Sequence, residues 1–288
     1  MRKNLTTRQL LDTAARALAA TSDTPELDAE VLLAHVLGRH RLRLHSHADE
    51  ESSEAAGAHF AHLIERRASG EPVAYIVGYK EFWSLHLAVT EAVLVPRPET
   101  ELLVERALAL APPTALRALD LGTGTGAIAL ALAHERPHWQ IVATDLSAPA
   151  LALAAKNAVA LRLPQVEFLC GAWFEPLAER RFELIVSNPP YVAANDPALL
   201  HAPLRHEPRL ALTPGDDALA DLRIIIRRAP GYLRRGGWLL LEHGTTQADE
   251  VARELVVRGF RHVRSQRDLA GHERMTEAQW GEQLPNEA

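Results

Sequence analysis

The sequence predicts an α/β fold, in which a small all-α N-terminal domain and a linking β-hairpin precede a doubly wound, mostly parallel sheet. From residue 98 onward, short apolar runs typical of buried strands alternate with helical segments, and this alternation indicates a parallel sheet with helices on both faces. Before residue 80, apolar residues recur at the spacing of amphipathic helices. We therefore divide the chain into three parts, 1–80, 81–96 and 97–282.

The N-terminal part predicts capped helices. A capping box at Thr6–Gln9 opens the first helix, and Thr24-Pro25 opens a second that continues to Leu37 and is closed by Gly38. A third helix is expected from about Ser52 to Gly70. No group of catalytic side chains lies in this part of the sequence.

Residues 81–96 predict a β-hairpin that links the two domains. The segment Phe82–Val89 alternates between apolar and polar residues, as a half-buried strand does. Val93–Val95 is its expected partner strand.

The C-terminal part predicts the parallel sheet. A helix from Pro98 to Leu110 and a break at Pro112-Pro113 come first. In such sheets, ligands bind at the carboxyl ends of the strands. The expected strands lie near residues 116–121, 140–145, 166–169, 182–187, 238–242 and 260–264.

A glycine loop follows the first of these strands. The run Gly122-Thr123-Gly124-Thr125-Gly126 separates the strand from a helix that begins at Ala127. Glycines allow the backbone to approach a ligand closely, but Gly122, Gly124 and Ala127 also satisfy a dinucleotide fingerprint. Asp145 ends the next strand and is placed to accept the hydroxyls of a ribose, which both NAD and S-adenosylmethionine carry. A nicotinamide therefore remains an alternative cofactor on this evidence.

The tetrapeptide Asn188-Pro189-Pro190-Tyr191 follows the strand at 182–187 and is suited to holding an NH2 group. The Asn188 side chain and the Pro189 carbonyl can each accept one N–H of a planar amide or base, which leaves the nitrogen lone pair aimed at a methyl donor. The prolines restrict the backbone, and the Tyr191 ring can lie against the planar target or the charged donor. An ordinary turn at a strand end is the simpler alternative. Hydride transfer has no use for such a clamp, so we favour S-adenosylmethionine over a nicotinamide.

The combined motifs resemble those of the release factor glutamine methyltransferases. These motifs are Val95–Glu101, the glycine loop, Asp145, Trp173 and Asn188–Tyr191, and the resemblance covers nearly the whole chain. It implies a class I, Rossmann-like methyltransferase that uses S-adenosylmethionine to methylate the side-chain nitrogen N5 of the glutamine in the Gly-Gly-Gln motif of class I peptide chain release factors. Methylation of a ribosomal protein glutamine, or of amino groups in nucleic acid, is the alternative. A catalytically idle methyltransferase fold is opposed by the intact Asn188 and glycine loop.

The resemblance also assigns roles to residues. The N-terminal helices carry no catalytic group of their own, and we interpret them as a bundle that recognises the protein substrate; a bundle that only covers the flank of the enzyme is the alternative. Two departures from the family pattern are Ala172, in place of a polar residue, and Ala218, in place of a glycine. The implied catalytic residues are Asn188, Pro189 and Tyr191; the cofactor-binding residues are Gly122, Thr123, Gly124, Thr125, Gly126, Asp145, Trp173 and Asn188; and the substrate-binding residues are Asn188, Pro189, Pro190 and Tyr191.

Composition and charge exclude several kinds of site and oppose nucleic acid as a direct partner. A net charge of −6 opposes a surface that binds nucleic acid directly. One cysteine, Cys170, excludes an intramolecular disulfide and a multi-cysteine zinc site. His134 and His138 match a zinc-protease spacing, but Pro137 prevents both from sharing a helix, so we expect no metal. No apolar run is long enough to span a membrane, and we expect a cytoplasmic monomer.

One long connection is expected to serve the site. Residues 192–215 are rich in proline and histidine, and we interpret them as a loop that contacts the substrate and closes over it.

Overall fold

The computed structural model describes residues 5–200 and 204–281, and its backbone contacts divide the chain into two units. The N-terminal unit comprises Met1–Tyr79 together with Leu200–His206. The larger unit comprises Lys80–Leu199 and Glu207–Ala288. Each unit has hydrophobic residues packed into a core of its own.

The N-terminal unit is all α. Thr6 and Gln9 form the expected capping box, because the Gln9 amide donates to Thr6 Oγ1 at 3.3 Å and the Thr6 amide donates to Gln9 Oε1 at 3.0 Å. The three long helices were predicted, whereas the two five-residue helices are too short to show a helical period. The helices are α1 (Thr7–Leu18), α2 (Pro25–Leu37), α3 (Leu42–Ser46), α4 (Glu54–Ala68) and α5 (Val73–Val77).

A buried ion pair joins two of these helices. Arg67 on α4 donates from Nε to Asp28 Oδ2 on α2 at 2.7 Å, and both residues are buried. Ser22 Oγ donates to the same carboxylate oxygen at 2.7 Å, so the buried charge is compensated by hydrogen bonds.

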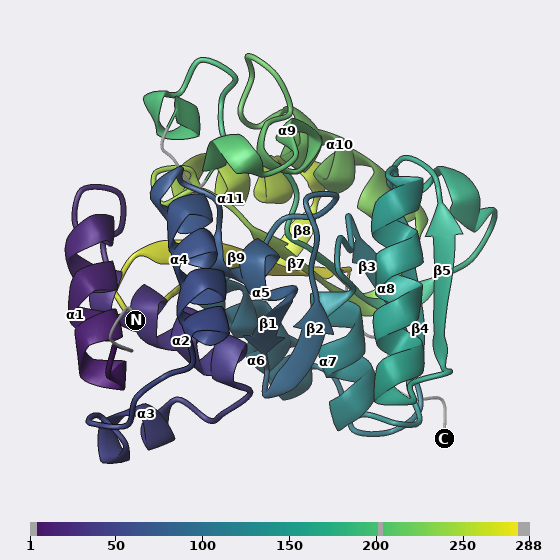
Figure 1. Cartoon of the computed structure of the whole chain (residues 1–288). Helices are drawn as coiled ribbons and strands as arrows, with labels where there is room; N and C mark the ends of the chain where they lie inside the picture. The colour runs from purple at the N-terminus through teal and green to yellow at the C-terminus, as the bar shows by residue number, and fades with distance from the viewer. Residues whose placement is uncertain (1–4, 201–203, 282–288) are drawn as a thin grey trace. The chain divides into compact units, whose positions relative to one another are not determined.

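The larger unit contains a seven-stranded sheet with the order β5-β4-β3-β6-β7-β9-β8 (Figure 1). All neighbouring strands from β5 to β7 are parallel, whereas β9 runs antiparallel to both β7 and β8. The chain reverses its winding direction between β3 and β6, which makes their carboxyl ends the expected ligand site. The strands are β3 (Arg117–Leu121), β4 (Gln140–Asp145), β5 (Val166–Cys170), β6 (Phe182–Ser187), β7 (Leu233–Glu242), β8 (Phe260–Arg267) and β9 (Glu273–Trp280).

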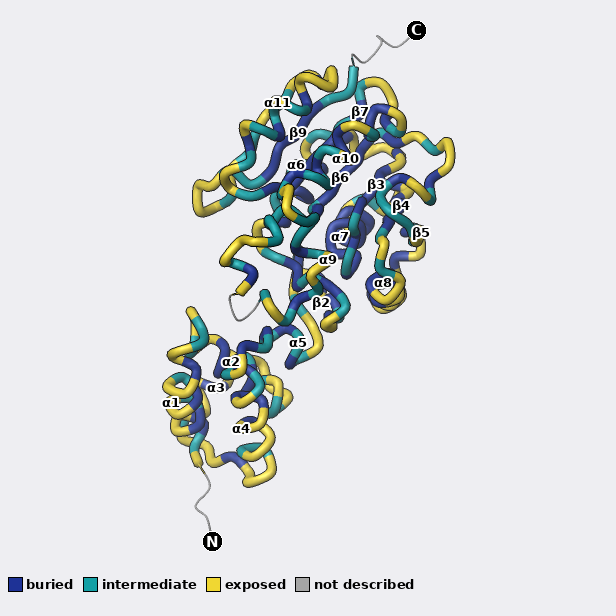
Figure 2. Tube along the Cα trace, turned by 90° about the horizontal axis from the view of Figure 1, so that it is seen from above, coloured by how far each residue is buried: buried dark blue, intermediate teal, exposed yellow. Residues whose placement is uncertain are grey.

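Helices cover both faces of this sheet. Side chains of α6, α7 and α8 join one core cluster, and those of α10 and α11 join the other. Consecutive residues of β3 alternate between the clusters, with Ala118 in the first and Leu119 in the second. Figure 2 shows the central strands and α7 as almost continuously buried. The helices are α6 (Glu101–Leu110), α7 (Ala127–Glu135), α8 (Ala148–Leu161), α9 (Arg209–Leu212), α10 (Ala220–Arg228) and α11 (Ala248–Arg258).

The predicted doubly wound α/β fold is confirmed, but the prediction omitted one strand near the C-terminus of the chain. Strand β9 was not predicted because its buried residues include the charged Glu277. That carboxylate accepts hydrogen bonds from Arg106 at 2.8 and 2.9 Å. β7 also begins earlier than expected and passes through Gly237, where a Cβ would lie 2.9 Å from the Glu183 carbonyl oxygen.

The hairpin has a different pairing from the predicted one. Strand β1 (Tyr79–Phe82) pairs with β2 (Leu85–Ala88), so the expectation that Val93–Val95 is the partner strand was wrong. The turn uses Trp83 and Ser84 at φ +50° and +58°, a conformation that glycine and asparagine normally signal. The Trp83 amide donates to Glu101 Oε1 at 2.8 Å, and this contact helps to hold the unusual turn.

The long connection at 192–215 is closed at its base. The Val192 amide donates to the Leu212 carbonyl at 3.1 Å, and the Ala194 amide donates to the Gly215 carbonyl at 2.8 Å. Between them lie short 3-10 turns at Pro197–Leu200 and Leu204–His206, followed by α9. Residues 201–203 of the predicted loop lie outside the described residues.

Candidate active site

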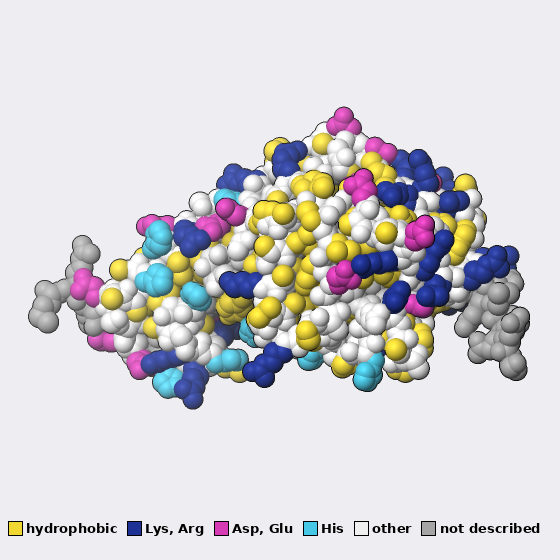
Figure 3. Space-filling view, turned by 90° about the vertical axis from the view of Figure 1, so that its right-hand side faces the viewer, with side chains coloured by type: hydrophobic (Ala, Val, Ile, Leu, Met, Phe, Trp, Pro, Cys, Tyr) yellow, Lys and Arg dark blue, Asp and Glu magenta, His cyan; other side chains and the backbone are white. Residues whose placement is uncertain are grey.

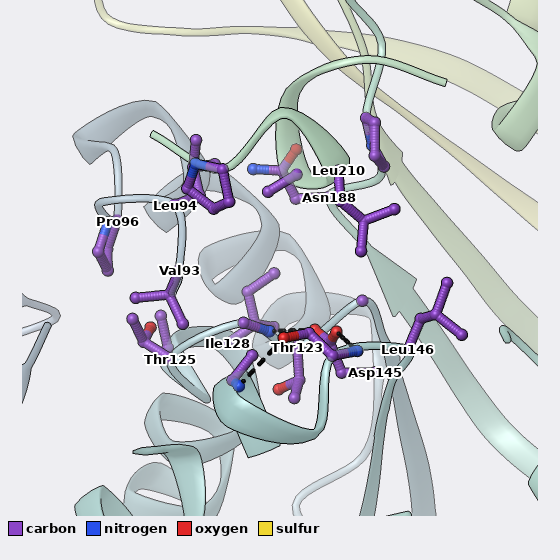
Figure 4. A pocket seen from close by; sticks show the side chains of 18 of the residues that line it. Val93, Leu94, Pro96, Thr123, Thr125, Ile128, Asp145, Leu146, Asn188 and Leu210 are labelled. Carbon is purple, nitrogen blue, oxygen red and sulfur yellow. Dashed lines mark hydrogen bonds between the residues drawn. The ribbon is translucent and has the colours of Figure 1, made fainter. Parts of the chain in front are cut away.

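A pocket in the larger unit opens at the carboxyl ends of β3, β4 and β6 (Figure 4). Figure 4 shows Asn188 on one side of this pocket and Asp145 on the opposite side. The glycine loop and the start of the Asn188–Tyr191 segment therefore meet at one site, as the sequence predicted. Of the predicted residues, Gly122, Thr123, Gly124, Thr125, Asp145, Trp173, Asn188 and Pro190 line the pocket.

The glycine loop adopts a backbone that favours glycine. Gly122, Gly124 and Gly126 have φ values of +72°, +56° and +84°. The amides of Gly122 and Thr123 both donate to the Thr144 carbonyl, at 2.9 and 3.0 Å. A Cβ on Gly126 would meet the Leu130 side chain at 3.0 Å, so Gly126 serves the packing of α7 while the other two glycines line the pocket.

Asp145 is held by backbone amides at the end of β4. Its Oδ2 accepts from the Gly124 amide at 2.8 Å, and its Oδ1 accepts from the Ser147 amide at 2.8 Å. Burial raises the pKa of the Asp145 carboxyl, while these hydrogen bonds oppose the rise. The carboxylate is thus fixed at the pocket wall and still has lone pairs free to accept further hydrogen bonds.

A second carboxyl, Asp120, supports the loop from below. It is fully buried at the end of β3, and its Oδ2 accepts from Thr123 Oγ1 at 2.6 Å and from the Ala129 amide at 3.3 Å. Its Oδ1 has no hydrogen-bond partner among the described residues. Burial raises the pKa of Asp120 to about 7, opposed by the Thr123 and Ala129 hydrogen bonds and assisted by the nearby Asp145 charge.

The Asn188–Tyr191 segment lies only partly in the pocket. Asn188 and Pro190 line it, whereas Pro189 is buried and neither Pro189 nor Tyr191 is among its lining residues. Asn188 donates from Nδ2 to Thr100 Oγ1 at 3.1 Å. Among the hydrogen bonds of the described residues, none ends on Asn188 Oδ1 or on the Pro189 carbonyl, so both acceptors remain available.

A buried carboxyl behind this segment was missed by the sequence analysis. Glu242, at the end of β7, accepts from Thr100 Oγ1 at 2.7 Å and from Tyr191 Oη at 3.1 Å. Burial raises the pKa of Glu242 to about 7, and burial also raises the pKa of the Tyr191 hydroxyl. A single acidic residue at the end of the apolar run Trp238–Leu241 was the available signal.

Trp173 lines the pocket beside the glycine loop. A Cβ on Gly122 would lie 3.4 Å from the Trp173 ring, so the two residues approach each other closely. Thr144 Oγ1 donates to the Trp173 carbonyl at 3.0 Å and holds this residue at φ +51°. Ala172 also lines the pocket, and its methyl side chain offers no polar group to a ligand.

Two segments that lie far apart in the sequence supply a further part of the pocket wall. The sequence analysis did not predict that they meet. One part comes from Ala92, Val93, Leu94, Pro96 and Arg97, and the other comes from Pro208, Leu210 and Ala211. Glu207 connects them, because it accepts a hydrogen bond from Arg97 Nη2 and another from the Val95 amide at 3.1 Å. Part of the 192–215 connection therefore lies at the pocket, where the predicted substrate loop was expected.

Residues 5–200 and 204–281 contain no cluster of three or more histidine, cysteine or acidic side chains placed to hold a metal ion. Over the same ranges, no helix combines the length and apolar character that crossing a bilayer requires. Cys170 is exposed at the end of β5.

The pocket is therefore suited to binding and orienting its ligands. It combines a backbone cradle, a fixed carboxylate and a side-chain carbonyl that accepts no hydrogen bond from the described residues, on walls that are largely apolar. Among the described residues that line it there is no cysteine, and the one serine, Ser147, caps α8 by accepting from the Ala150 amide at 3.3 Å. Such an arrangement can orient two molecules against each other.

Comparisons with known proteins agree with this chemistry. Residues 9–78 match the PrmC N-terminal domain, and residues 98–217 match the methyltransferase small domain. A release factor glutamine methyltransferase from Yersinia pestis is 49% identical over 92% of this chain and 96% of its own length. One from Xylella fastidiosa is also 49% identical, over 90% of this chain and 94% of its own length.

A solved structure extends the likeness to the fold. The hMettl16 catalytic domain, solved in complex with the MAT2A 3′UTR hairpin 6, has a TM-score of 0.59 and is 18% identical, covering 77% of this chain and 84% of that one. This likeness concerns the fold alone. On the strength of its close relatives, the chain belongs to the release factor glutamine methyltransferase family.

Proposed function

We propose that this protein transfers the methyl group of S-adenosylmethionine to the side-chain nitrogen N5 of the glutamine in the Gly-Gly-Gln motif of class I peptide chain release factors. The observation that carries the proposal is that Asn188, whose Oδ1 accepts no hydrogen bond from the described residues, lines the same pocket as the glycine loop and Asp145. Membership of the release factor glutamine methyltransferase family supports both the reaction and the substrate.

The donor fits the residues of one wall. Gly122–Gly126 would follow its methionine and ribose parts closely, because glycines at positive φ leave room for a ligand against the backbone. Asp145 would accept both ribose hydroxyls, and Trp173 and Leu146 would pack by the adenine. When bound, S-adenosylmethionine supplies a methyl group activated by an adjacent positively charged sulfur.

The acceptor fits the opposite wall. Asn188 Oδ1 and the Pro189 carbonyl would each accept one N–H of the glutamine amide, which fixes the plane of the NH2 group and aims its lone pair at the donor side. Pro190 would bound the substrate pocket. A strong base is not required, because the methylated amide nitrogen is acidic and loses its extra proton to water.

Tyr191 would contribute from behind the site. Its hydroxyl donates to buried Glu242, which holds the end of the tetrapeptide. Contact between its ring and the planar target, as expected from the sequence, remains part of the proposal.

The larger partner is proposed to be a protein, with no direct nucleic acid contact. The net charge is −6, and on the face shown in Figure 3 basic and acidic side chains are intermixed. Ion pairs such as Arg180–Glu167 and Arg234–Glu183 neutralise several arginines of the larger unit. We further propose that the enzyme acts as a monomer in the cytoplasm, where translation terminates.

The N-terminal unit is proposed to recognise the release factor. It corresponds to residues 1–80 of the sequence division, with 81–96 as the linker and 97–282 as the methyltransferase domain. The unit has its own core and lacks residues of the pocket, which supports separate tasks for the two parts.

The experiment is a methyl-transfer assay with labelled S-adenosylmethionine. Purified release factors, ribosomal proteins and nucleic acids are incubated separately with the enzyme, and modified peptides are located by mass mapping. Label on the Gly-Gly-Gln glutamine is the expected result. Label confined to a ribosomal protein glutamine or to a base amino group would refute the proposed substrate.

A further inference from the structure

We propose that Thr100 and Glu242 form a positioning relay that fixes the orientation of the Asn188 side-chain amide. The inference rests on the proposed function, because it concerns how that reaction's acceptor is held. Thr100 lies within the Val95–Glu101 motif without an assigned role, and Glu242 lies outside the motifs.

The relay consists of hydrogen bonds between three distant parts of the chain. Asn188 donates from Nδ2 to Thr100 Oγ1 at 3.1 Å, and Thr100 Oγ1 donates to Glu242 Oε2 at 2.7 Å. Thr100 ends a 3-10 turn at Pro98–Thr100, Glu242 ends β7, and Asn188 follows β6. Thr100 and Glu242 are 5% and 1% exposed, so water does not compete for these bonds.

The relay has a direction because of what each group can donate. In its ionised form Glu242 only accepts hydrogen bonds, and the Thr100 hydroxyl has one hydrogen to give. Once the Thr100 hydrogen is directed at Glu242, the Thr100 oxygen can only accept. Asn188 must therefore turn its NH2 group toward Thr100, and its Oδ1 then points away from Thr100, which is the orientation needed to accept an N–H of the substrate.

The same carboxylate holds the other end of the tetrapeptide. Tyr191 Oη donates to Glu242 Oε1 at 3.1 Å, so both ends of Asn188–Tyr191 are tied to one buried group. Arg274 on β9 and Glu99 face this carboxyl and act in opposite directions on its charge. A buried acid is costly unless it is fully bonded, and here each of its oxygens accepts from a residue that controls the clamp.

A simpler role for Thr100 is separable by experiment. Thr100 also lines the pocket, so its hydroxyl could contact the donor directly. In that case its loss would weaken donor binding. A relay acting through Asn188 instead leaves donor affinity intact and lowers the rate of transfer.

The test uses three variants of the full chain. Thr100→Val keeps the shape of threonine without its hydroxyl, Thr100→Ala removes the hydroxyl without adding a methyl group, and Thr100→Ser keeps the hydroxyl. We expect Val and Ala to lower kcat by about 10- to 100-fold with little change in the KM for release factor. We expect Ser to recover most of this loss, and calorimetry to give an unchanged Kd for S-adenosylmethionine in all three.

A double-mutant cycle gives the sharpest readout. Because the relay acts through Asn188, Thr100→Val should cause no further loss in an Asn188→Ala background, whereas independent effects would multiply. Wild-type kcat in Thr100→Val and Thr100→Ala, an equal loss in Thr100→Ser, or multiplying losses in the cycle would each overturn the relay. Failure of the proposed function is distinguishable, since wild-type enzyme would then leave release factor unmethylated.

Discussion

The backbone amide of Gly124 donates to Asp145 Oδ2 at 2.8 Å, which links the turn after β3 to the end of β4. This bond joins the glycine loop to a carboxylate that is itself held by the Ser147 amide. The site wall is therefore preorganised, and little ordering remains to oppose donor binding.

Asp145→Ala should weaken S-adenosylmethionine binding by about 1.5–3 kcal/mol, the scale of hydrogen bonds to a charged group. The rate at saturating donor should change less. Titration calorimetry measures the affinity, with exposed Asp12→Ala as the control. An unchanged donor affinity, or binding of NAD instead, would contradict the assignment of Asp145.

Asn188→Ala should strongly lower the rate of methyl transfer while the fold stays intact. The substitution removes one of the two acceptors that orient the target nitrogen, and we expect a loss of about 10²-fold or more. Single-turnover rates with labelled donor measure the effect. Glu179→Ala, at an exposed position of the larger unit outside the pocket and the 192–215 connection, is the control. A single-turnover rate within a few-fold of wild type would refute the role.

Gly122→Ala should impair donor binding through the loop backbone. Gly122 has φ +72°, and its new Cβ would lie 3.4 Å from the Trp173 ring; the positive φ alone costs about 1–2 kcal/mol. Gly57→Ala is the control, because that glycine lies inside α4 with nothing within 4 Å of the added Cβ. Calorimetry and thermal unfolding should show a loss for the first variant and a small gain in stability for the second.

Local motifs could be read from the sequence, whereas long-range polar contacts could not. The glycine loop and Asn188 each follow an apolar strand, so the parallel-sheet pattern was enough to predict that they meet. Thr100 and Glu242 are 142 residues apart, and no local pattern indicates that a buried acid will find that hydroxyl. Strand β9 was not predicted for the same reason. A charged residue such as Glu277 is normally expected to be exposed to solvent, and only the structure shows that its buried carboxylate is paired with Arg106.

The free energy of unfolding should depend on pH through Asp120. Its pKa is about 7 in the folded state against 3.8 ordinarily, so between these values the native state binds the extra proton. The stabilisation is complete below the lower value and is lost as pH rises through about 7. Relative to Asp120→Asn, wild-type stability should fall by about 1.4 kcal/mol per pH unit in that window and level off above it.

Urea unfolding of both proteins at several pH values between 4 and 8 measures this difference. Glu242 also has a raised pKa, but it is present in both proteins and cancels from the comparison. A difference that stays constant over the whole range would show that Asp120 titrates normally.

Deleting the N-terminal unit should separate recognition from chemistry. Every residue that lines the active-site pocket belongs to the larger unit, while the helices α1–α5 have their own core. One glutamine side chain cannot provide specific recognition of a large protein. A truncated enzyme that begins before β1 should therefore bind S-adenosylmethionine normally but show a sharply raised KM for intact release factor.

A short Gly-Gly-Gln peptide should be a poor substrate for both forms, since it lacks the remote surface. If the truncated enzyme methylated whole release factor with unchanged kcat/KM, the helices would serve only as a cover, and recognition would have to come from the 192–215 connection.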